Sequence, residues 1–237
     1  MVTLSLLGKL LKLPDCIMPT LMGKTFFWII SGSLSLFPVL VFAQDEDLYF
    51  QALDVQGRVT AYHDQTDSTT PLRKRQVVDD GDWVMTGPKS QAILRLKDRA
   101  YLYLAPNTKI AISRLAWGEK GPNCQLKLLQ GRALCQMDSV PTWPFDITAG
   151  NVQCAAHGVL FEISLKKNDV KVISFDGAVV AITKGRTRIA KTFQLLKYEN
   201  GKFRYKNYHL KAEDENHAQQ WKDDLEKILE KSPPNSN

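Results

Sequence analysis

This chain has few of the residues that build catalytic or metal centres, since its 237 residues include four His and four Cys. No Gly-rich loop is followed by a helical pattern, so the sequence offers no phosphate cradle. Cys154 and His157 are the one close pair of soft ligands, and in a strand their odd separation sends them to opposite faces. Adjacent acids, as at 79–80 and 223–224, also diverge. We therefore predict that the protein is not an enzyme and holds no metal or cofactor.

Helical spacing is absent between Leu48 and Ile182. Apolar residues alternate there with a period of two, and Gly, Asp or Pro interrupts them about every eight to twelve residues. This pattern predicts an all-β domain over residues 44–190, built of twisted, stacked antiparallel or solenoid-like strands. The chain is long enough to enclose a sizeable core in one such domain.

A strong charge of either sign is also missing. The formal net charge is +6, and it becomes +4 once residues 1–43, with Lys9, Lys12, Lys24 and Asp15, are set aside. So weak an excess does not require a polyanion as partner. We do not expect a nucleic acid as partner.

An apolar run from Thr25 to Ala43 follows Lys24 and contains Pro38 near its end. A positive start, an apolar middle and a small final residue are typical of a signal peptide, so we predict cleavage after Ala43 and a periplasmic or secreted protein. Residues 1–21 then form a dispensable extension. The alternative is an uncleaved signal anchor, because a 19-residue segment over 25–43 is about long enough to span a bilayer.

Three cysteines follow the predicted cleavage site, and exported proteins usually pair their cysteines. A turn at Gln130–Gly131 would place Cys124 and Cys135 on the same face of a hairpin. We therefore favour a Cys124–Cys135 disulfide with Cys154 free. A Cys135–Cys154 bridge is the alternative.

A ladder of short strands begins at Gly81 and ends at Thr108. It reads Gly-Asp, an apolar strand, Thr-Gly, an alternating strand, an Asp-centred turn, a second alternating strand and Pro-Asn-Thr. This order resembles the FecR-like domain family. A second stretch, 144–163, resembles the family's Phe-x-Ile-Thr and Arg-Gly-Thr-x-Phe strands, although His157 and Val159 replace the Arg and the second Thr. The resemblance covers residues 53–183.

The family positions that this chain matches are Gly81, Asp82, Thr86, Asp98, Pro106, Gly131, Gly158, Phe161 and Gly177. Within the ladder we expect Ile93, Leu102 and Leu104 to face the core, and the glycines to occupy turns. Conformity of this kind indicates a fold before it indicates a function.

In FecR-type regulators, such a domain lies in the periplasm behind one membrane helix and a cytoplasmic segment that holds a sigma factor. Residues 1–24 are too short to be that segment, so we expect a stand-alone, exported FecR-like protein that acts as a non-catalytic binding, scaffolding or signalling module. A membrane-tethered sensor subunit is the alternative if the apolar segment stays uncleaved. An envelope hydrolase is a third, less favoured hypothesis.

Residues 191–237 are expected to form a hairpin and a helix. Asn200–Gly201 lies between two alternating segments, which is a strong hairpin signal. In the second of these, Lys202, Arg204 and Lys206 would share one face, a possible docking surface for another envelope protein or an anionic envelope polymer. From Ala212 an amphipathic helix follows, and its apolar stripe would place Trp221 and Leu225 against the sheet. The stripe comprises Ala218, Trp221, Leu225, Ile228 and Leu229.

Overall fold

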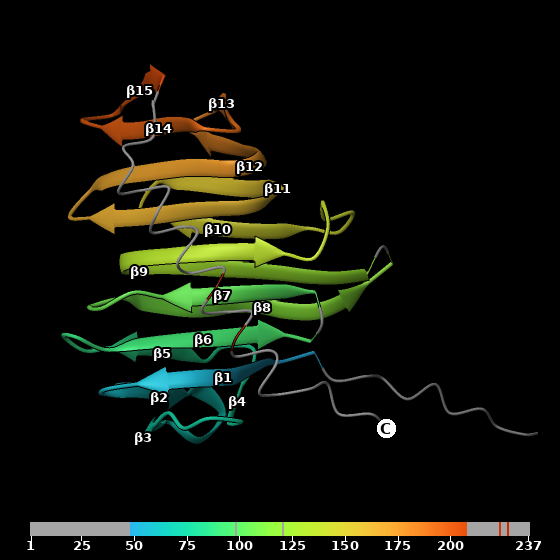
Figure 1. The fold of residues 1–237 in the computed structure, drawn as a ribbon, viewed down its shortest axis with the longest axis vertical. Coiled ribbons are helices and arrows are strands. Elements are labelled where there is room, and N and C mark those ends of the chain that lie inside the picture. The colour runs from blue at the N-terminus through green and yellow to red at the C-terminus, as the bar shows by residue number, and fades with distance from the viewer. Residues whose placement is uncertain (1–47, 98, 120, 208–222, 224–226, 228–237) are drawn as a thin grey trace, which may run out of the picture. The chain divides into compact units, whose positions relative to one another are not determined.

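The structure is a computed structural model that describes residues 48–97, 99–119, 121–207, 223 and 227 (Figure 1). The chain divides into two compact units, Met1–Gln44 and Asp45–Asn237, and all of the described residues belong to the second unit. Among these residues, no helix has the length and apolar composition needed to cross a membrane.

Strands dominate the described residues, as the alternating pattern predicts. In chain order they are β1 Phe50–Gln56, β2 Val59–His63, β3 Ser68–Pro71, β4 Val77–Val78, β5 Trp83–Thr86, β6 Gln91–Leu96, β7 Ala100–Leu104, β8 Lys109–Gly118, β9 Gly121–Met137, β10 Phe145–Ala149, β11 Val152–Lys166, β12 Asp169–Thr183, β13 Arg186–Lys191, β14 Gln194–Glu199 and β15 Lys202–Asn207. A short 3-10 helix, η1, spans Asp64–Thr66.

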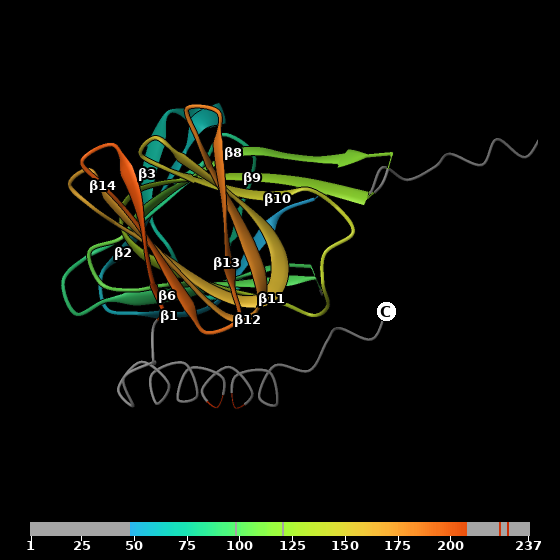
Figure 2. The same ribbon diagram turned by 90° about the horizontal axis from the view of Figure 1, so that it is seen from above.

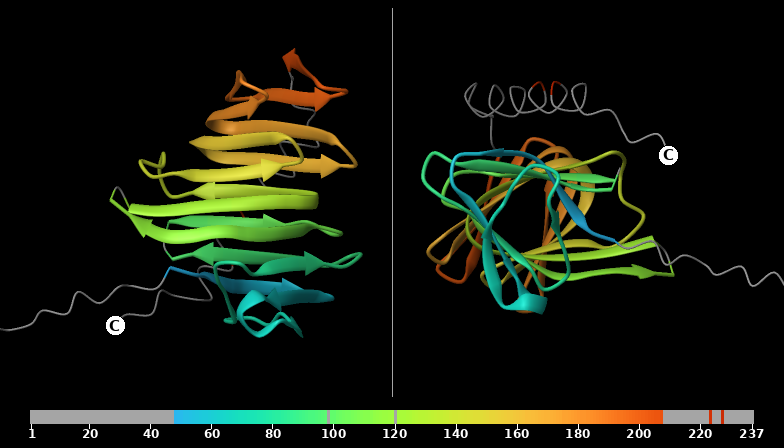
Figure 3. Two further views of the ribbon diagram at one scale, coloured as in Figure 1. Left: turned by 180° about the vertical axis from the view of Figure 1, so that it is seen from behind. Right: turned by 90° about the horizontal axis from the view of Figure 1, so that it is seen from below.

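The strands form one hydrogen-bonded sheet that is folded into two walls (Figures 2 and 3). The first wall follows the order β4-β1-β6-β7-β9-β11-β12-β14-β15. The second wall follows β3-β2-β5-β8-β9-β10-β11-β12-β13. Nearly all neighbours are antiparallel, whereas β9 and β10 are parallel. The expected stacked β domain is therefore confirmed, as a mixed rather than a purely antiparallel sheet.

Three long strands join the two walls, because each bends and pairs with different partners at its two ends. The first half of β9 pairs with residues 110–118 of β8, and its second half pairs with β7 and β11. The bend lies at Gly131, which has φ +90. A Cβ there would lie 2.5 Å from the Cα atom of Thr108, so only glycine fits this corner.

The bends of β11 and β12 meet at a second pair of glycines. Gly158 and Gly177 face each other where the register between the two strands shifts. A Cβ on Gly158 would collide with the carbonyl oxygen of Asp176 and lie 2.8 Å from the backbone nitrogen of Ala178. Three of the predicted family glycines thus lie where the long strands change walls.

The main core fills the space between the two walls with side chains from strands along the whole sheet. Among its members, Phe50, Leu94, Phe161 and Ile147 are fully buried. Leu102 and Leu104 belong to this core, as predicted.

A second apolar cluster lies apart from this core, on the outer face of the first wall. It consists of Leu53, Ile93, Tyr101, Leu134, Leu160, Ile173, Phe175 and Leu195. Ile93 is buried as predicted, at 3% exposed, but in this second cluster and not in the main core. In β6 the core-facing positions are Ala92, Leu94 and Leu96, and the period of two sends Ile93 to the other side.

The predicted terminal hairpin is confirmed, because β14 and β15 pair across Asn200 and Gly201. Both turn residues have positive φ, 50 and 76, as a tight two-residue hairpin turn requires. The hairpin extends the first wall, since β14 pairs with β12. The predicted C-terminal helix falls outside the described residues, apart from Asp223 and Lys227, which are helical.

The predicted disulfide does not form in this structure, where Cys124, Cys135 and Cys154 are free, buried thiols. The expected turn at Gln130–Gly131 is wrong as well, because β9 runs without interruption through these residues. Cys124 and Cys135 therefore lie in one bent strand and not on two strands of a hairpin. Burial raises the pKa of Cys154 to about 12. Burial also raises the pKa of Cys135, and the neighbouring thiols of Cys124 and Cys154 raise it further.

Gly158→Ala should test the close approach of β11 and β12. We expect it to lower the free energy of unfolding by about 1–3 kcal/mol, because backbone atoms would have to move to admit the methyl group. Gly118→Ala is the matched control, since the nearest atom to its Cβ is 3.5 Å away. Urea unfolding followed by circular dichroism measures both, and equal midpoints would contradict the proposed steric role.

Candidate interaction surface

The Gly81–Asp82 motif builds a corner at the start of β5. Asp82 is only 3% exposed, and its carboxylate accepts hydrogen bonds from the backbone nitrogens of Asp64, at 3.0 Å, and Asp79, at 3.1 Å. His63 Nδ1 lies 2.8 Å from the same carboxylate. One buried side chain thereby ties β2, η1 and the turn before β5 together.

The His63 ring continues this network, since its Nε2 lies 3.2 Å from the hydroxyl oxygen of Thr70. An acid, an imidazole and a hydroxyl in such a chain have the spacing of a nucleophile with its base and orienting group. Gln76 Nε2 donates to the same hydroxyl, at 3.3 Å, and none of these residues lines the cavity described below. The Asp82 carboxylate also accepts from two backbone nitrogens, so the arrangement closes a turn. Sequence reasoning missed it because 19 residues separate His63 from Asp82.

The Thr-Gly and Pro-Asn-Thr motifs meet at the opposite end of β5. Thr86 is buried, and its hydroxyl donates to the carbonyl of Ala105 at 2.6 Å and accepts from the backbone nitrogen of Thr108 at 2.9 Å. The Thr108 hydroxyl in turn bonds both to the carbonyl and to the backbone nitrogen of Arg132, each at 3.0 Å. These contacts fix β5 to β8 and to the bend of β9.

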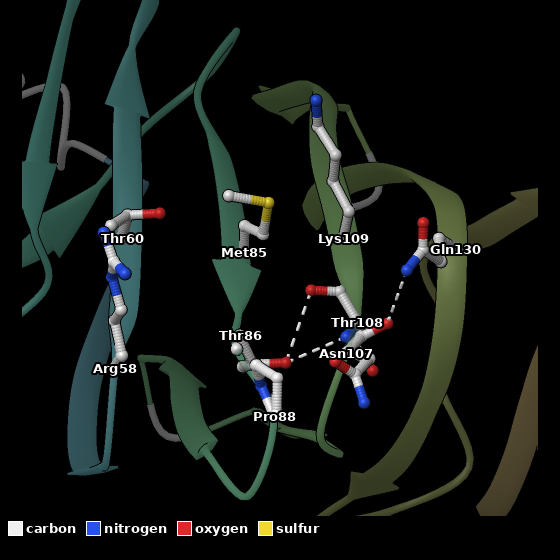
Figure 4. Close-up of a pocket in the computed structure, with 10 residues that line it drawn as sticks. Arg58, Thr60, Met85, Thr86, Pro88, Asn107, Thr108, Lys109 and Gln130 are labelled. Atoms are coloured by element: carbon white, nitrogen blue, oxygen red, sulfur yellow. Dashed lines mark hydrogen bonds between the residues drawn. The ribbon is translucent and has the colours of Figure 1, made fainter.

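A cavity of about 330 Å³ opens beside this corner (Figure 4). It crosses β2, β5, β8 and β9 on the outer face of the second wall. Its lining includes a thioether, side-chain amides and basic side chains, and no acidic residue: Arg58, Thr60, Met85, Thr86, Gly87, Pro88, Asn107, Thr108, Lys109 and Gln130.

Beside the cavity, two aromatic rings and a lysine form a row across β2, β5 and β8. Tyr62 and Trp83 stack with centroids 5.0 Å apart, and Lys109 Nζ lies 3.8 Å from the Trp83 centroid. This cation–π contact holds the ammonium group at the protein surface. Met85, on the same face, is 42% exposed. The outer face of the second wall thus exposes aromatic, apolar and basic side chains to solvent.

The hairpin has the orientation predicted for its two kinds of side chain. Phe203 packs against the core and meets Tyr198 edge to face at 5.2 Å. Lys202 and Arg204 point to the other face and are exposed. The side chain of Lys206 lies outside the described residues. Lys197, in β14, stands opposite Arg204 and forms an ion pair with Glu199 at 3.5 Å.

The other predicted positions are scattered. Asp98 lies outside the described residues, and Pro106 is in the turn between β7 and β8. Cys154 is buried whereas His157 is exposed, so the two point to opposite faces. Within the described ranges, no three His, Cys, Asp or Glu side chains gather where they could hold a metal ion.

Most of the motif positions lie in a segment that matches a known protein family. Residues 82–180 match the family model described as FecR protein. This segment is similar to FecR domains. The match begins at the buried Asp82 and ends in β12, beyond Gly177, so it includes the corner residues and the three long strands. The resemblance predicted from the motifs is confirmed over these residues.

Two crystal structures, each described as a "putative anti-sigma factor" from Parabacteroides distasonis ATCC 8503, are similar to this chain at 13% and 14% identity, with TM-scores of 0.46 and 0.48. The similarity covers 53% and 60% of this chain. It spans 59% and 64% of those chains, less than two thirds of their length. No curated protein matches the chain.

Asp82→Asn should test whether this buried carboxylate stabilises the fold. The amide keeps the shape but turns one acceptor into a donor, so one of the buried N–H groups loses its partner, at a cost of about 1–3 kcal/mol. Asp169→Asn, at an exposed residue, should leave stability unchanged. Thermal unfolding of both variants gives the comparison, and a neutral Asp82→Asn would show that the corner forms without the carboxylate.

Proposed function

We propose that this protein is exported and acts in the cell envelope as a non-catalytic binding or signalling module. The observation that carries the proposal is how its motif residues are used. Asp82, Thr86 and Thr108 direct their polar atoms to backbone groups inside the fold. Because these atoms hold the strands together, function is left to the outer surfaces.

Charge distribution indicates which surface meets the partner. Residues 166–204 contain ten basic and three acidic side chains, whereas residues 48–165 are nearly balanced in the described ranges. The basic residues are Lys166, Lys167, Lys171, Lys184, Arg186, Arg188, Lys191, Lys197, Lys202 and Arg204. The positive charge therefore concentrates in the last strands, β12 to β15. Such a patch attracts an acidic envelope protein or an anionic envelope polymer.

The β14–β15 hairpin is the proposed centre of this surface. Lys202 and Arg204 are exposed on one face while Phe203 anchors the other face to the core. A rigid strand holds the two cations in place, so binding loses little side-chain order. Lys206 follows the same alternation in sequence and would extend the row.

Reversing the charge with Lys202→Glu and Arg204→Glu should weaken retention on envelope fractions about tenfold at low salt, since exposed charge pairs contribute up to about 1 kcal/mol each. The difference should shrink as salt rises. The double variant Arg73→Glu and Lys74→Glu, with the same charge change in the exposed segment between β3 and β4, is the control. Retention that both pairs of substitutions leave equal across the salt series would remove the hairpin from the proposal.

A membrane-tethered sensor is the second candidate, and the apolar segment at residues 25–43 is the observation that favours it. The two candidates share the folded unit and differ in the processing of this segment. A cleaved chain diffuses in the envelope, while an anchored chain stays at the membrane and reports binding from there.

The mature N-terminus decides between them. We expect sequencing of the exported protein to begin at Gln44, because Ala43 ends an apolar run of the kind that a signal peptidase cleaves. Intact mass measurement provides the same information independently. A mass that retains residues 25–43 would support the tethered sensor instead.

A further inference from the structure

The second apolar cluster forms a continuous stripe on the outside of the first wall. It takes one or two side chains from each of seven strands, in the order β1, β6, β7, β9, β11, β12 and β14. Its members are only between 1% and 8% exposed. Apolar side chains on the outer face of the second wall are far more exposed to solvent: Met85 is 42% exposed and Leu129 is 40% exposed. A cover is therefore needed over the stripe.

We infer that residues 212–231 of the same chain cover this stripe as an amphipathic helix. This segment lies outside the described residues except for Asp223 and Lys227. Those two are helical and exposed, which fixes the phase of the helix. At 100° per residue, Trp221, Leu225 and Ile228 lie roughly opposite them, so the apolar stripe of the helix points away from solvent.

The lengths of the two stripes agree. Seven neighbouring strands are separated by six gaps, which at about 4.8 Å each span about 29 Å. Twenty helical residues, 212–231, are about 30 Å long at 1.5 Å per residue. One helix that crosses the strands can thus cover the whole cluster from β14 to β1.

Chain connection sets the direction of the helix. β15 ends at Asn207 beside β14, where the stripe begins. The four residues 208–211 suffice only to turn the chain back over this wall, so the helix begins over β14 and runs toward β1. In this register Trp221 lies about 13 Å along the axis, close to β9 and Leu134.

Charge supports the same placement. Arg95, Arg132, Lys171 and Lys197 lie two positions from stripe residues in β6, β9, β12 and β14, so they flank the stripe on its own face. Glu162, ion-paired with Arg132 at 3.6 Å, is the acid buried among them. Residues 208–237 contain seven acidic and four basic side chains. The helix therefore supplies the charge that this face attracts.

A consequence concerns the binding surface. With the first wall covered, the cavity beside Arg58 and Met85 and the row of Tyr62, Trp83 and Lys109 remain on the open wall. Partners in solution would then meet the second wall and the exposed Lys202 and Arg204 at the end of the first wall, beyond the helix. The C-terminal segment meanwhile keeps the apolar stripe from associating with other molecules.

Disulfide cross-linking of the predicted mature chain, residues 44–237, tests the register. Leu134→Cys with Trp221→Cys should give an intramolecular bond under mild oxidation. Leu134→Cys with Asp223→Cys, which uses the exposed side of the same helix, should give much less. The native thiols are buried and should not interfere. Equal cross-linking in the two pairs, or a bond between two copies of the chain, would overturn the inference.

A second measurement covers the case in which the cysteine variants fail to fold. Leu225→Ser should lower Tm by roughly 5–15 °C, as expected for a buried leucine in a unit of this size. Lys227→Ser, two residues away on the exposed side, should shift it by no more than about 2 °C. Equal Tm values for the two variants would show that the helix does not pack on the stripe.

Discussion

The bending of β9, β11 and β12 from one wall into the other is the constraint on which the rest of the structure depends. A strand can serve both walls only if its backbone approaches a neighbour closely at the corner. Gly131, Gly158 and Gly177 provide that space, and a Cβ at any of them would meet backbone atoms. The core lies between the two walls. The three glycines let the long strands bend from one wall into the other, and these bends enclose the core.

Polar side chains complete the corners that the glycines open. Asp82 and Thr86 lie at the two ends of β5 and satisfy backbone groups that would otherwise be buried without partners. A family motif made of such residues preserves a fold and leaves the choice of partner free.

The two walls then differ in what they offer to other molecules. The outer face of the first wall is an apolar stripe that must be covered, and the outer face of the second holds the cavity and the aromatic row. At the end of the stack, the cationic β14–β15 hairpin remains in water while Phe203 anchors it. Interaction is therefore expected on the second wall and on the hairpin.

The sequence by itself determined the all-β class, the FecR resemblance and the Asn200–Gly201 hairpin, because alternation and turn chemistry are local properties of the chain. Only the tertiary structure decided that Gln130–Gly131 is a bend, that Ile93 belongs to the second apolar cluster and that His63 meets Asp82. Local patterns do not show which strands pair across long separations. The Cys124–Cys135 prediction failed for that reason, since a bend and a hairpin turn both favour glycine at the same position.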